Sequence, residues 1–194
     1  MDVEALRDEF PALRQGDGTL VYLDGAATTP KPRCVIDAVA GAYVQGLAGA
    51  HRGVHRWSAA ATDALERTRA EVGAWLRAGG PEEVVFVRGA TEALNLVASG
   101  WSEGRLRPGD EVLVSGLEHH SSVLPWRRAG RRAGARLVVA PIDDTGTVPV
   151  ESFTRRMNAR TRAVVMTHVS NVTGAILPVR AVASGPTRCR RAAR

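Results

Sequence analysis

The sequence predicts an α/β fold, in which a mostly parallel sheet carries helices on both faces. Two observations support this class. Short runs of β-branched and apolar residues alternate with longer stretches of helical periodicity. The predicted strands and helices also follow one another in turn, which is typical of right-handed crossovers that cover a parallel sheet on both sides.

The predicted elements follow one another from residue 58 onward. We expect strands at 82–89, 110–116, 135–141 and 161–171, and helices at 58–79, 91–101, 122–134 and 149–157. Ser58 is a suitable N-cap for the first helix, and Gly79–Gly80 is a suitable stop. In a sheet of this kind, ligands bind beyond the carboxyl ends of the strands.

The composition is ordinary for a soluble protein: the chain has 194 residues, of which 44% are hydrophobic and 24% are charged. No apolar run approaches the ~20 residues that cross a bilayer, and the start is unlike a signal peptide, so we expect a cytoplasmic protein with no membrane partner. The net charge is +6, and all but one of the 26 basic residues are arginines. The stretch "WRRAGRRAGAR" (126–136) leaves nucleic-acid binding open as an alternative. Because no aromatic ladder accompanies it, we expect a solvated helix face and no nucleic-acid partner.

Residues capable of chemistry stand just past the predicted strands. After the first strand, Gly89 frees the backbone, and Ala90 and Thr91 open a helix whose N–H groups and hydroxyl can cradle an anion. An ordinary capped helix start explains this segment as well. His119 and His120 follow the second strand, and Asn171 follows the fourth. A phosphate cradle, a flat aromatic ring and an amide at one sheet edge suit a planar phosphorylated cofactor.

Other kinds of site fit the residues less well. The side chains of adjacent His119 and His120 diverge, and Gly53 interrupts the spacing of His51 and His55, so we expect no metal site. A serine hydrolase is disfavoured because the chain has no Gly-x-Ser-x-Gly elbow. The two cysteines form neither a disulfide framework nor a paired metal motif.

Five motifs occur in a characteristic order and spacing. They are "VYLDGAATTPKP", "AHRGVHRWSAAAT", "EEVVFVRGATEALNLVA", "GDEVLVSGLEHHSSVLPW" and "THVSNVTGAILPV", which together extend from about Leu20 to Val179. They resemble the N-terminal half of cysteine desulfurases, pyridoxal-phosphate (PLP) enzymes of the class V aminotransferase family. The resemblance is to the sulfur-mobilising group that includes selenocysteine lyases. It implies an incomplete large domain of the PLP-dependent transferase fold, fold type I.

The resemblance implies a role for each candidate residue. His119 stacks on the pyridine ring of PLP and takes part in proton transfers, while His120 points away. Thr91, with the N–H groups of Ala90 and Thr91, binds the phosphate. Asn171 donates to the phenolic oxygen of the cofactor. The segments that line the substrate pocket contribute Ala26, Ala27, His51 and Arg52.

The resemblance also implies a reaction and partners. The substrate is cysteine, which is converted to alanine while the sulfur passes to the enzyme as a persulfide. Selenocysteine and related C–S substrates remain alternatives. A homodimer and a sulfur-acceptor protein, with a role in iron–sulfur cluster assembly, are implied in the same way.

Four groups that the family's chemistry needs are not matched in this chain. They are a Schiff-base lysine in a Ser-x-His-Lys segment, an aspartate in an Asp-x-Ala-Gln segment, a carboxylate-binding arginine and a nucleophilic cysteine. Lys31 lies in the N-terminal loop, and neither Cys34 nor Cys189 matches the nucleophile. We therefore expect a truncated, inactive desulfurase. A non-catalytic PLP-binding or subunit-pairing protein is the alternative.

The sequence divides into three segments. We interpret residues 1–57 as an N-terminal segment with pocket-lining loops, and 58–180 as a partial PLP-binding large domain. Residues 181–194 form an Arg-rich tail without apolar periodicity. A tail of this composition is what a GC-rich gene yields when it is read out of frame, so we expect a frameshift or a gene fragment.

Overall fold

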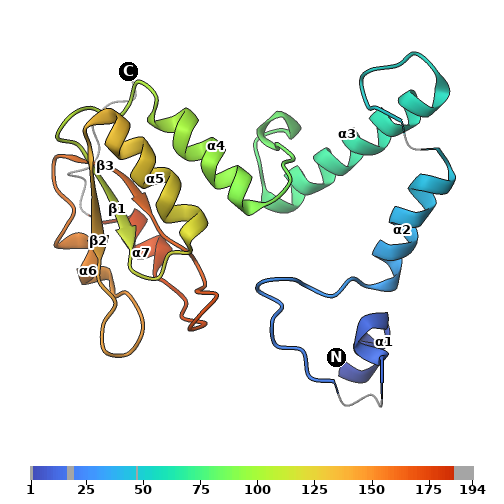
Figure 1. Ribbon diagram of the computed structural model, residues 1–194, viewed down its shortest axis with the longest axis horizontal. Coiled ribbons are helices and arrows are strands. Elements are labelled where there is room, and N and C mark those ends of the chain that lie inside the picture. Colours follow the sequence, from blue (N-terminus) through green and yellow to red (C-terminus); the bar gives the residue numbers. More distant parts are fainter. Residues whose placement is uncertain (1, 17–19, 47, 186–194) are drawn as a thin grey trace. The chain divides into compact units, whose positions relative to one another are not determined.

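A computed structural model describes residues 2–16, 20–46 and 48–185 of the chain (Figure 1). The chain divides into two compact units: unit 1 is Met1–Phe86 and unit 2 is Val87–Arg194. The predicted boundary between residues 57 and 58 differs from this division, because α3 (Arg56–Leu76) belongs to unit 1.

Unit 2 is built around a parallel three-stranded sheet. Its strands are β1 (Glu111–Ser115), β2 (Arg136–Ala140) and β3 (Thr161–Val165), in the order β2-β1-β3 (Figure 1). Every residue of β1 is buried, because a strand pairs with it on each side and hydrophobic clusters cover both faces of the sheet. All three strands begin at the same edge, so the loops after them emerge together at the other edge.

Helices cover both faces of this sheet. On one face, Val112 and Val114 pack with Ala98 of α4 (Ala90–Ser102) and Trp126 of α5 (His120–Ala133). On the other, Leu113 packs with Phe153 of α6 (Val150–Thr154) and with Val182 of α7 (Val179–Ala183), among other residues. The side chains of β1 alternate between these two clusters, as the period of a strand requires. The predicted α/β class, with a parallel sheet and helices on both faces, is confirmed.

Unit 1 is helical in the residues that the structure describes. It contains α1 (Val3–Asp8), a 3₁₀ helix η1 (Pro11–Arg14), α2 (Arg33–Val44), α3 and a second 3₁₀ helix η2 (Pro81–Glu83). Asp2 caps α1, since its carboxylate accepts hydrogen bonds from the N–H groups of Glu4 and Ala5. No helix among the described residues of the whole chain has the length and apolar character to cross a membrane.

The prediction of a strand at 82–89 is wrong. Residues 81–83 form η2, and residues 84–88 have no strand partner. Val84 has an extended backbone, with φ −101° and ψ 118°, and only its side chain among these five residues is buried. β-branched residues favour extended backbone, but a strand also needs a neighbour to complete its hydrogen bonds, and here none is present.

Two further boundaries differ from the prediction. α3 begins at Arg56 and its N-cap is His55, whose ring Nδ1 accepts from Ser58 N–H at 3.4 Å. Ser58 therefore lies inside the helix, and Arg77 rather than the glycine pair ends it, with a left-handed φ of 55°. β3 ends at Val165, and the residues predicted to continue it form a loop that is closed by one antiparallel bridge between Val169 and Ile176.

The first residues of the predicted tail belong to the packed part of unit 2. Val182, in α7, is only 5% exposed and lies in the same cluster as Phe153. Residues 186–194, including Cys189, lie outside the described residues.

Candidate functional site

The loops after β1 and β3 carry two of the predicted cofactor-binding residues. β1 ends at Ser115 and leads to His119, and β3 ends at Val165 and leads to Asn171. Because the two strands pair in parallel, both loops begin at the same edge of the sheet. The structure therefore places the roots of these two loops side by side in unit 2.

The start of α4 has the properties of an anion cradle. Its N-cap is Gly89, so no side chain bonds to the first turn. A Cβ at Gly89 would meet no atom within 4 Å, which shows that the space beside this glycine is open. The first-turn N–H groups of Ala90, Thr91 and Glu92 have no acceptor within the helix, as at any helix start. These donors, with the positive end of the helix, suit a phosphate group.

Glu92 lies in the first turn of α4 but is turned back along the chain. Its carboxylate accepts from Arg88 N–H at 2.8 Å and forms an ion pair with Arg88 Nε at 3.3 Å. The hydrogen bond from the Arg88 backbone is the main cause of the lowered pKa of Glu92, with a further contribution from the Arg88 side chain. This arrangement engages the carboxylate with Arg88 and leaves the N–H groups of the first turn available.

His119 is held in a defined orientation at the start of α5. It is the N-cap of this helix, and its Nδ1 accepts from Ser121 N–H at 3.2 Å and lies 2.8 Å from Ser121 Oγ. Since Nδ1 accepts a hydrogen bond from an N–H group, the neutral ring carries its proton on Nε2. The rings of His119 and His120 are 6.2 Å apart and inclined at 52°, so they do not stack on each other, and both residues are exposed.

Asn171 lies on a tight turn that is anchored by Ser170. Ser170 is buried, its Oγ accepts from Val172 N–H and Thr173 N–H at 3.2 and 3.3 Å, and its own N–H donates to Ala175. Asn171 itself is exposed, and among the described residues its amide makes no hydrogen bond. It is therefore available to a ligand.

The predicted substrate-pocket residues lie in unit 1, on two separate loops. Ala26 and Ala27 lie in a turn closed by hydrogen bonds from Ala27 and Thr28 N–H to the Asp24 carbonyl, and Arg52 is exposed on the loop before α3. His51, on the same loop as Arg52, has a positive φ of 59°. The predicted substrate-pocket residues thus belong to unit 1, and the predicted cofactor-binding residues belong to unit 2.

The loop that carries His51 is hydrogen-bonded to α3. Ser58, buried within α3, donates to the Gly49 carbonyl at 2.7 Å and accepts from Gly53 N–H at 2.9 Å. His51 N–H donates to Thr62 Oγ1 at 2.9 Å, and His51 Nε2 lies 3.1 Å from a carboxylate oxygen of Glu66. These contacts hold a non-glycine residue in the left-handed region, where it would otherwise be strained.

The structure places Lys31 in the N-terminal loop and Cys34 at the start of α2. Lys31 Nζ donates to the Thr29 carbonyl, two residues away in the N-terminal loop. Cys34 is exposed in the first turn of α2. Within the described part of the chain, no group of three or more His, Cys, Asp or Glu side chains is arranged to hold a metal ion.

One residue of this region was not singled out by the sequence reasoning. Glu118, directly before His119, accepts hydrogen bonds from Ser115 at the end of β1 and from Thr167 just beyond the end of β3. Its place just past a strand was the signal available in the sequence, but a carboxylate in that position predicts no particular partner.

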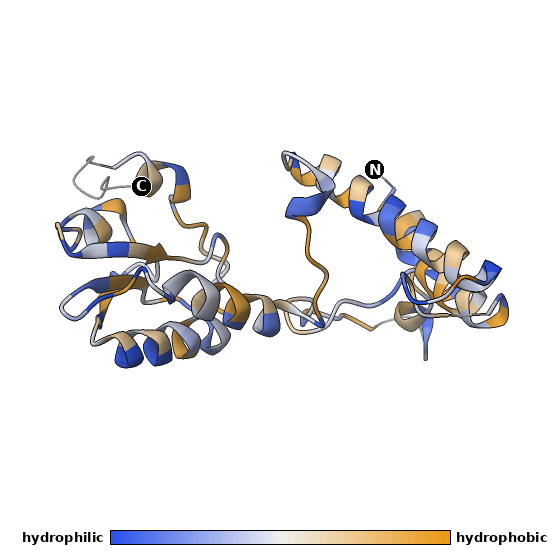
Figure 2. Cartoon of the chain, turned by 90° about the horizontal axis from the view of Figure 1, so that it is seen from above, coloured by the Kyte–Doolittle hydropathy of each residue, from blue (hydrophilic) through white to orange (hydrophobic). Residues whose placement is uncertain are grey.

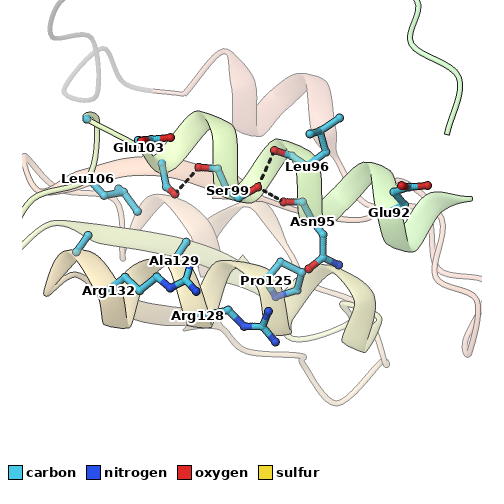
Figure 3. A pocket seen from close by; sticks show the side chains of 13 residues that line it. Glu92, Asn95, Leu96, Ser99, Glu103, Leu106, Pro125, Arg128, Ala129 and Arg132 are labelled. Atoms are coloured by element: carbon cyan, nitrogen blue, oxygen red, sulfur yellow. Dashed lines mark hydrogen bonds between the residues drawn. The ribbon is translucent and has the colours of Figure 1, made fainter. Parts of the chain in front are cut away.

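A cavity of about 720 Å³ lies elsewhere in unit 2, between α4 and α5 (Figure 3). Arg128 and Arg132 lie along its α5 side, and Leu96 and Ser99 are among its α4 residues. Ala90, Thr91, His119 and Asn171 do not line it. None of these four predicted cofactor-binding residues lines the cavity, whose charged lining consists of Arg128 and Arg132 and of the carboxylates of Glu92 and Glu103.

Comparisons with known proteins identify the family to which the chain is similar. Residues 21–189 match the sequence model of the family described as aminotransferase class-V. A probable cysteine desulfurase from Vibrio cholerae is 41% identical over 184 residues, which are 94% of this chain and 46% of that protein. The chain thus spans about half the length of the curated relatives it matches.

Solved structures show the same similarity. The cysteine desulfurase CsdA from Escherichia coli has a TM-score of 0.78 and 32% identity, over 92% of this chain and 44% of the other. A cysteine desulfurase from Thermococcus onnurineus has a TM-score of 0.81 and 34% identity, over 91% and 42% of the two chains. The fold-type-I architecture predicted from the sequence is confirmed by these likenesses, which cover less than half of each solved chain.

Proposed function

The chain belongs to the class V aminotransferase family, and from that membership we propose that it is the cofactor-facing N-terminal portion of a PLP-dependent cysteine desulfurase. The observation that carries the proposal is the open first turn of α4, which lies in the same unit as the exposed side chains of His119 and Asn171. The relatives named cysteine desulfurase support cysteine as the substrate. Selenocysteine and other C–S substrates are the alternatives within the same proposal.

Four residues of unit 2 would hold the cofactor. The N–H groups of Ala90 and Thr91, with the Thr91 hydroxyl, would bind the phosphate, and the His119 ring would lie against the pyridine ring. Asn171 would donate its amide N–H to the phenolic oxygen. When bound, PLP supplies an electron sink for cleavage at the substrate. His119, with its proton on Nε2, can present that proton to a neighbouring group.

The same proposal covers the surroundings of the site. Ala26, Ala27, His51 and Arg52 would line the substrate pocket, where the positive charge of Arg52 can attract a carboxylate. The protein would act in the cytoplasm as a homodimer and would pass sulfur to a sulfur-acceptor protein. The sulfur taken from cysteine would be used in iron–sulfur cluster assembly.

We propose further that these residues alone bind PLP without turnover. The one lysine, Lys31, donates its Nζ to the Thr29 carbonyl in the N-terminal loop of unit 1. Binding would then rest on the phosphate contacts and on ring stacking, and the chain would be a non-catalytic PLP-binding protein. Dialysis should remove the bound PLP, and borohydride should not fix it. A borohydride-stable adduct on Lys31 would overturn this part of the proposal.

A titration of the chain with PLP, and in parallel with pyridoxal, tests the cofactor site. Thr91→Val should weaken PLP binding by about tenfold, because a hydrogen bond to a charged phosphate is lost, and should leave pyridoxal binding unchanged. His119→Ala should weaken both ligands, and His120→Ala should have a much smaller effect.

Arg128→Ala is the matched control, because Arg128 lines the cavity between α4 and α5 rather than the cradle. Its PLP affinity should equal that of the unmodified chain. If Arg128→Ala weakens PLP while Thr91→Val does not, the phosphate binds in the cavity and the assignment of the cradle is wrong. Equal losses from His119→Ala and His120→Ala would contradict the stacking role of His119.

A further inference from the structure

We propose that Glu118 is a positioning residue, which fixes the His119 loop and the Asn171 loop relative to each other. This inference rests on the proposed function, because it assigns a purpose to the spacing of two residues that would face PLP. It goes beyond that function, because Glu118 itself would touch neither the cofactor nor the substrate.

The carboxylate of Glu118 bonds to the ends of two adjacent strands. Its Oε1 accepts from the Oγ of Ser115, the last residue of β1, at 2.7 Å. The same oxygen accepts from the N–H of Thr167, two residues beyond the end of β3. The backbone pairing of β1 with β3 ends at Val114 and Val165. Glu118 therefore continues the connection between the strands by a side chain, where the backbone ladder has stopped.

The two donors depend on this acceptor. Ser115 is only 2% exposed and Thr167 is half-buried, so water cannot readily replace the carboxylate at Ser115. A buried donor without an acceptor is costly, and a carboxylate is the stronger of the acceptors available to proteins. No ion pair involves Glu118 among the described residues. Glu118 therefore acts as a hydrogen-bond acceptor. The position requires a side-chain oxygen that can reach both Ser115 Oγ and Thr167 N–H.

Both contacts lie at the roots of the predicted site. Glu118 immediately precedes His119, which begins α5. Thr167 begins the turn that leads to Asn171, and its Oγ1 donates to the Val169 carbonyl at 3.0 Å. One carboxylate thus restrains the first residues of two loops whose tips would meet the same flat ligand. Among the described residues, no hydrogen bond or ion pair joins Glu118 to the start of α4, so we expect phosphate binding there to be independent of Glu118.

The experiment compares PLP with inorganic phosphate as ligands of the whole chain. Glu118→Ala removes the acceptor, Glu118→Gln keeps an oxygen at the same reach without the charge, and Glu118→Asp keeps the charge but is one methylene shorter. Glu151→Ala, at an exposed glutamate of α6, is the matched control. Ligand affinities are measured by following amide resonances of Ala90 and Thr91 and, for PLP, the absorbance of the cofactor.

We expect Glu118→Ala and Glu118→Asp to weaken PLP binding by about tenfold and to leave phosphate binding unchanged, whereas Glu118→Gln restores PLP affinity to within about threefold. General damage to the fold would instead weaken both ligands. Unchanged PLP affinity in Glu118→Ala, or an equal loss for phosphate, would overturn the proposal. If Glu118→Ala does not fold, the PLP and phosphate affinities of Glu118→Asp and Glu118→Gln are compared instead. Equal PLP affinities in these two variants would overturn the proposal.

A second readout separates this inference from the proposed function. The Thr167 amide proton and the side-chain amide of Asn171 are followed by NMR without any ligand. In Glu118→Ala both should shift, while in Glu118→Gln the Asn171 amide should keep its position. If the unmodified chain does not bind PLP but these shifts occur, the proposed cofactor is wrong and the positioning role stands. If the Asn171 resonance is the same in all variants, the positioning role is wrong whatever PLP does.

Discussion

Glu111 shows how a single buried carboxylate is stabilised by its neighbours. It is only 3% exposed, at the start of β1, and it accepts hydrogen bonds from Asn158 at 2.8 Å and Arg136 at 2.7 Å, with Arg160 at 3.3 Å. The hydrogen bond from Asn158 is the largest cause of its lowered pKa, and the two arginines lower it further against the opposing effect of burial. These partners come from the β2 and β3 sides of the strand, so Glu111 joins all three strands at the edge opposite the candidate site.

A lowered pKa makes the contribution of Glu111 to stability depend on pH. Because the ionised form is favoured in the folded state, the stabilisation is present above the ordinary pKa of a glutamate and is lost as the pH falls through the lower, folded pKa. We expect Glu111→Gln to be less stable than the unmodified chain at neutral pH. The difference should shrink as the pH falls below the ordinary pKa of a glutamate and through the lowered pKa of Glu111 in the folded state, where the wild-type carboxylate gains a proton.

Urea unfolding followed by circular dichroism, repeated across this pH range, checks the expectation. Glu151→Gln, at an exposed glutamate, serves as the control and should be indistinguishable from the unmodified chain throughout. A stability difference for Glu111→Gln that stays constant with pH would show that the charge of Glu111 is not what stabilises the strand.

At the level of elements, α4 and α5 are joined by an aromatic contact. The rings of Trp101 and Trp126 lie 5.6 Å apart at 64°, an edge-to-face arrangement, and Trp126 is only 5% exposed. Trp126 also packs against the β1 side chains Val112 and Val114. The position of α4, and with it the phosphate cradle at its start, depends on this packing.

Trp126→Ala should therefore lower the free energy of unfolding of unit 2 by about 3–5 kcal/mol, the usual cost of emptying a buried aromatic position. Trp75→Ala is the matched control. Trp75, in α3, is 83% exposed, and its replacement should change stability by less than about 0.5 kcal/mol. The measurement is amide exchange of the β1 residues, which reports the stability of the sheet. Similar effects from both substitutions would contradict the role given to Trp126.

At the scale of the whole molecule, the two units differ in how much apolar surface they bury. Both hydrophobic clusters of the described residues consist of unit 2 side chains. In unit 1, apolar residues recur along α2 and α3 between hydrophilic ones (Figure 2), but large side chains such as Leu23, Val44 and Trp75 are mostly exposed. Hydrophobic burial is the main favourable contribution to folding, so unit 1 has much the smaller share of it.

We expect hydrogen exchange to separate the two units. Amides of α2 and α3 should exchange at rates close to those of an isolated helix, because helices without tertiary packing are marginal in water. Amides of β1 should be protected by the full stability of unit 2. Limited proteolysis should cut first within residues 20–86. Protection of α2 and α3 equal to that of β1 would contradict this expectation and would show that further contacts stabilise unit 1, such as self-association through its exposed apolar side chains.

Much of the fold could be predicted from local pattern. The predicted strands at 110–116 and 135–141 correspond to β1 and β2, and the predicted helices at 91–101 and 122–134 correspond to α4 and α5. These segments combine clear periodicity with burial, so local preference and tertiary packing agree. The strand predicted at 82–89 failed because its β-branched residues favour an extended backbone but cannot supply a neighbouring strand.

For the candidate site, too, some features could be predicted from the sequence and others could not. By itself the sequence determined the α/β class, the family resemblance and the residue types at each strand end. Hydrophobic periodicity, the positions of glycine residues and the order of the motifs can all be read directly from the chain. Only the tertiary structure decided that β1 and β3 are neighbours, that Ser170 anchors the Asn171 turn and that Glu118 bonds to both strand ends. The hydrogen bond between Glu118 and Thr167 joins residues 49 positions apart, and no local pattern specifies the partner of a hydrogen bond over that distance.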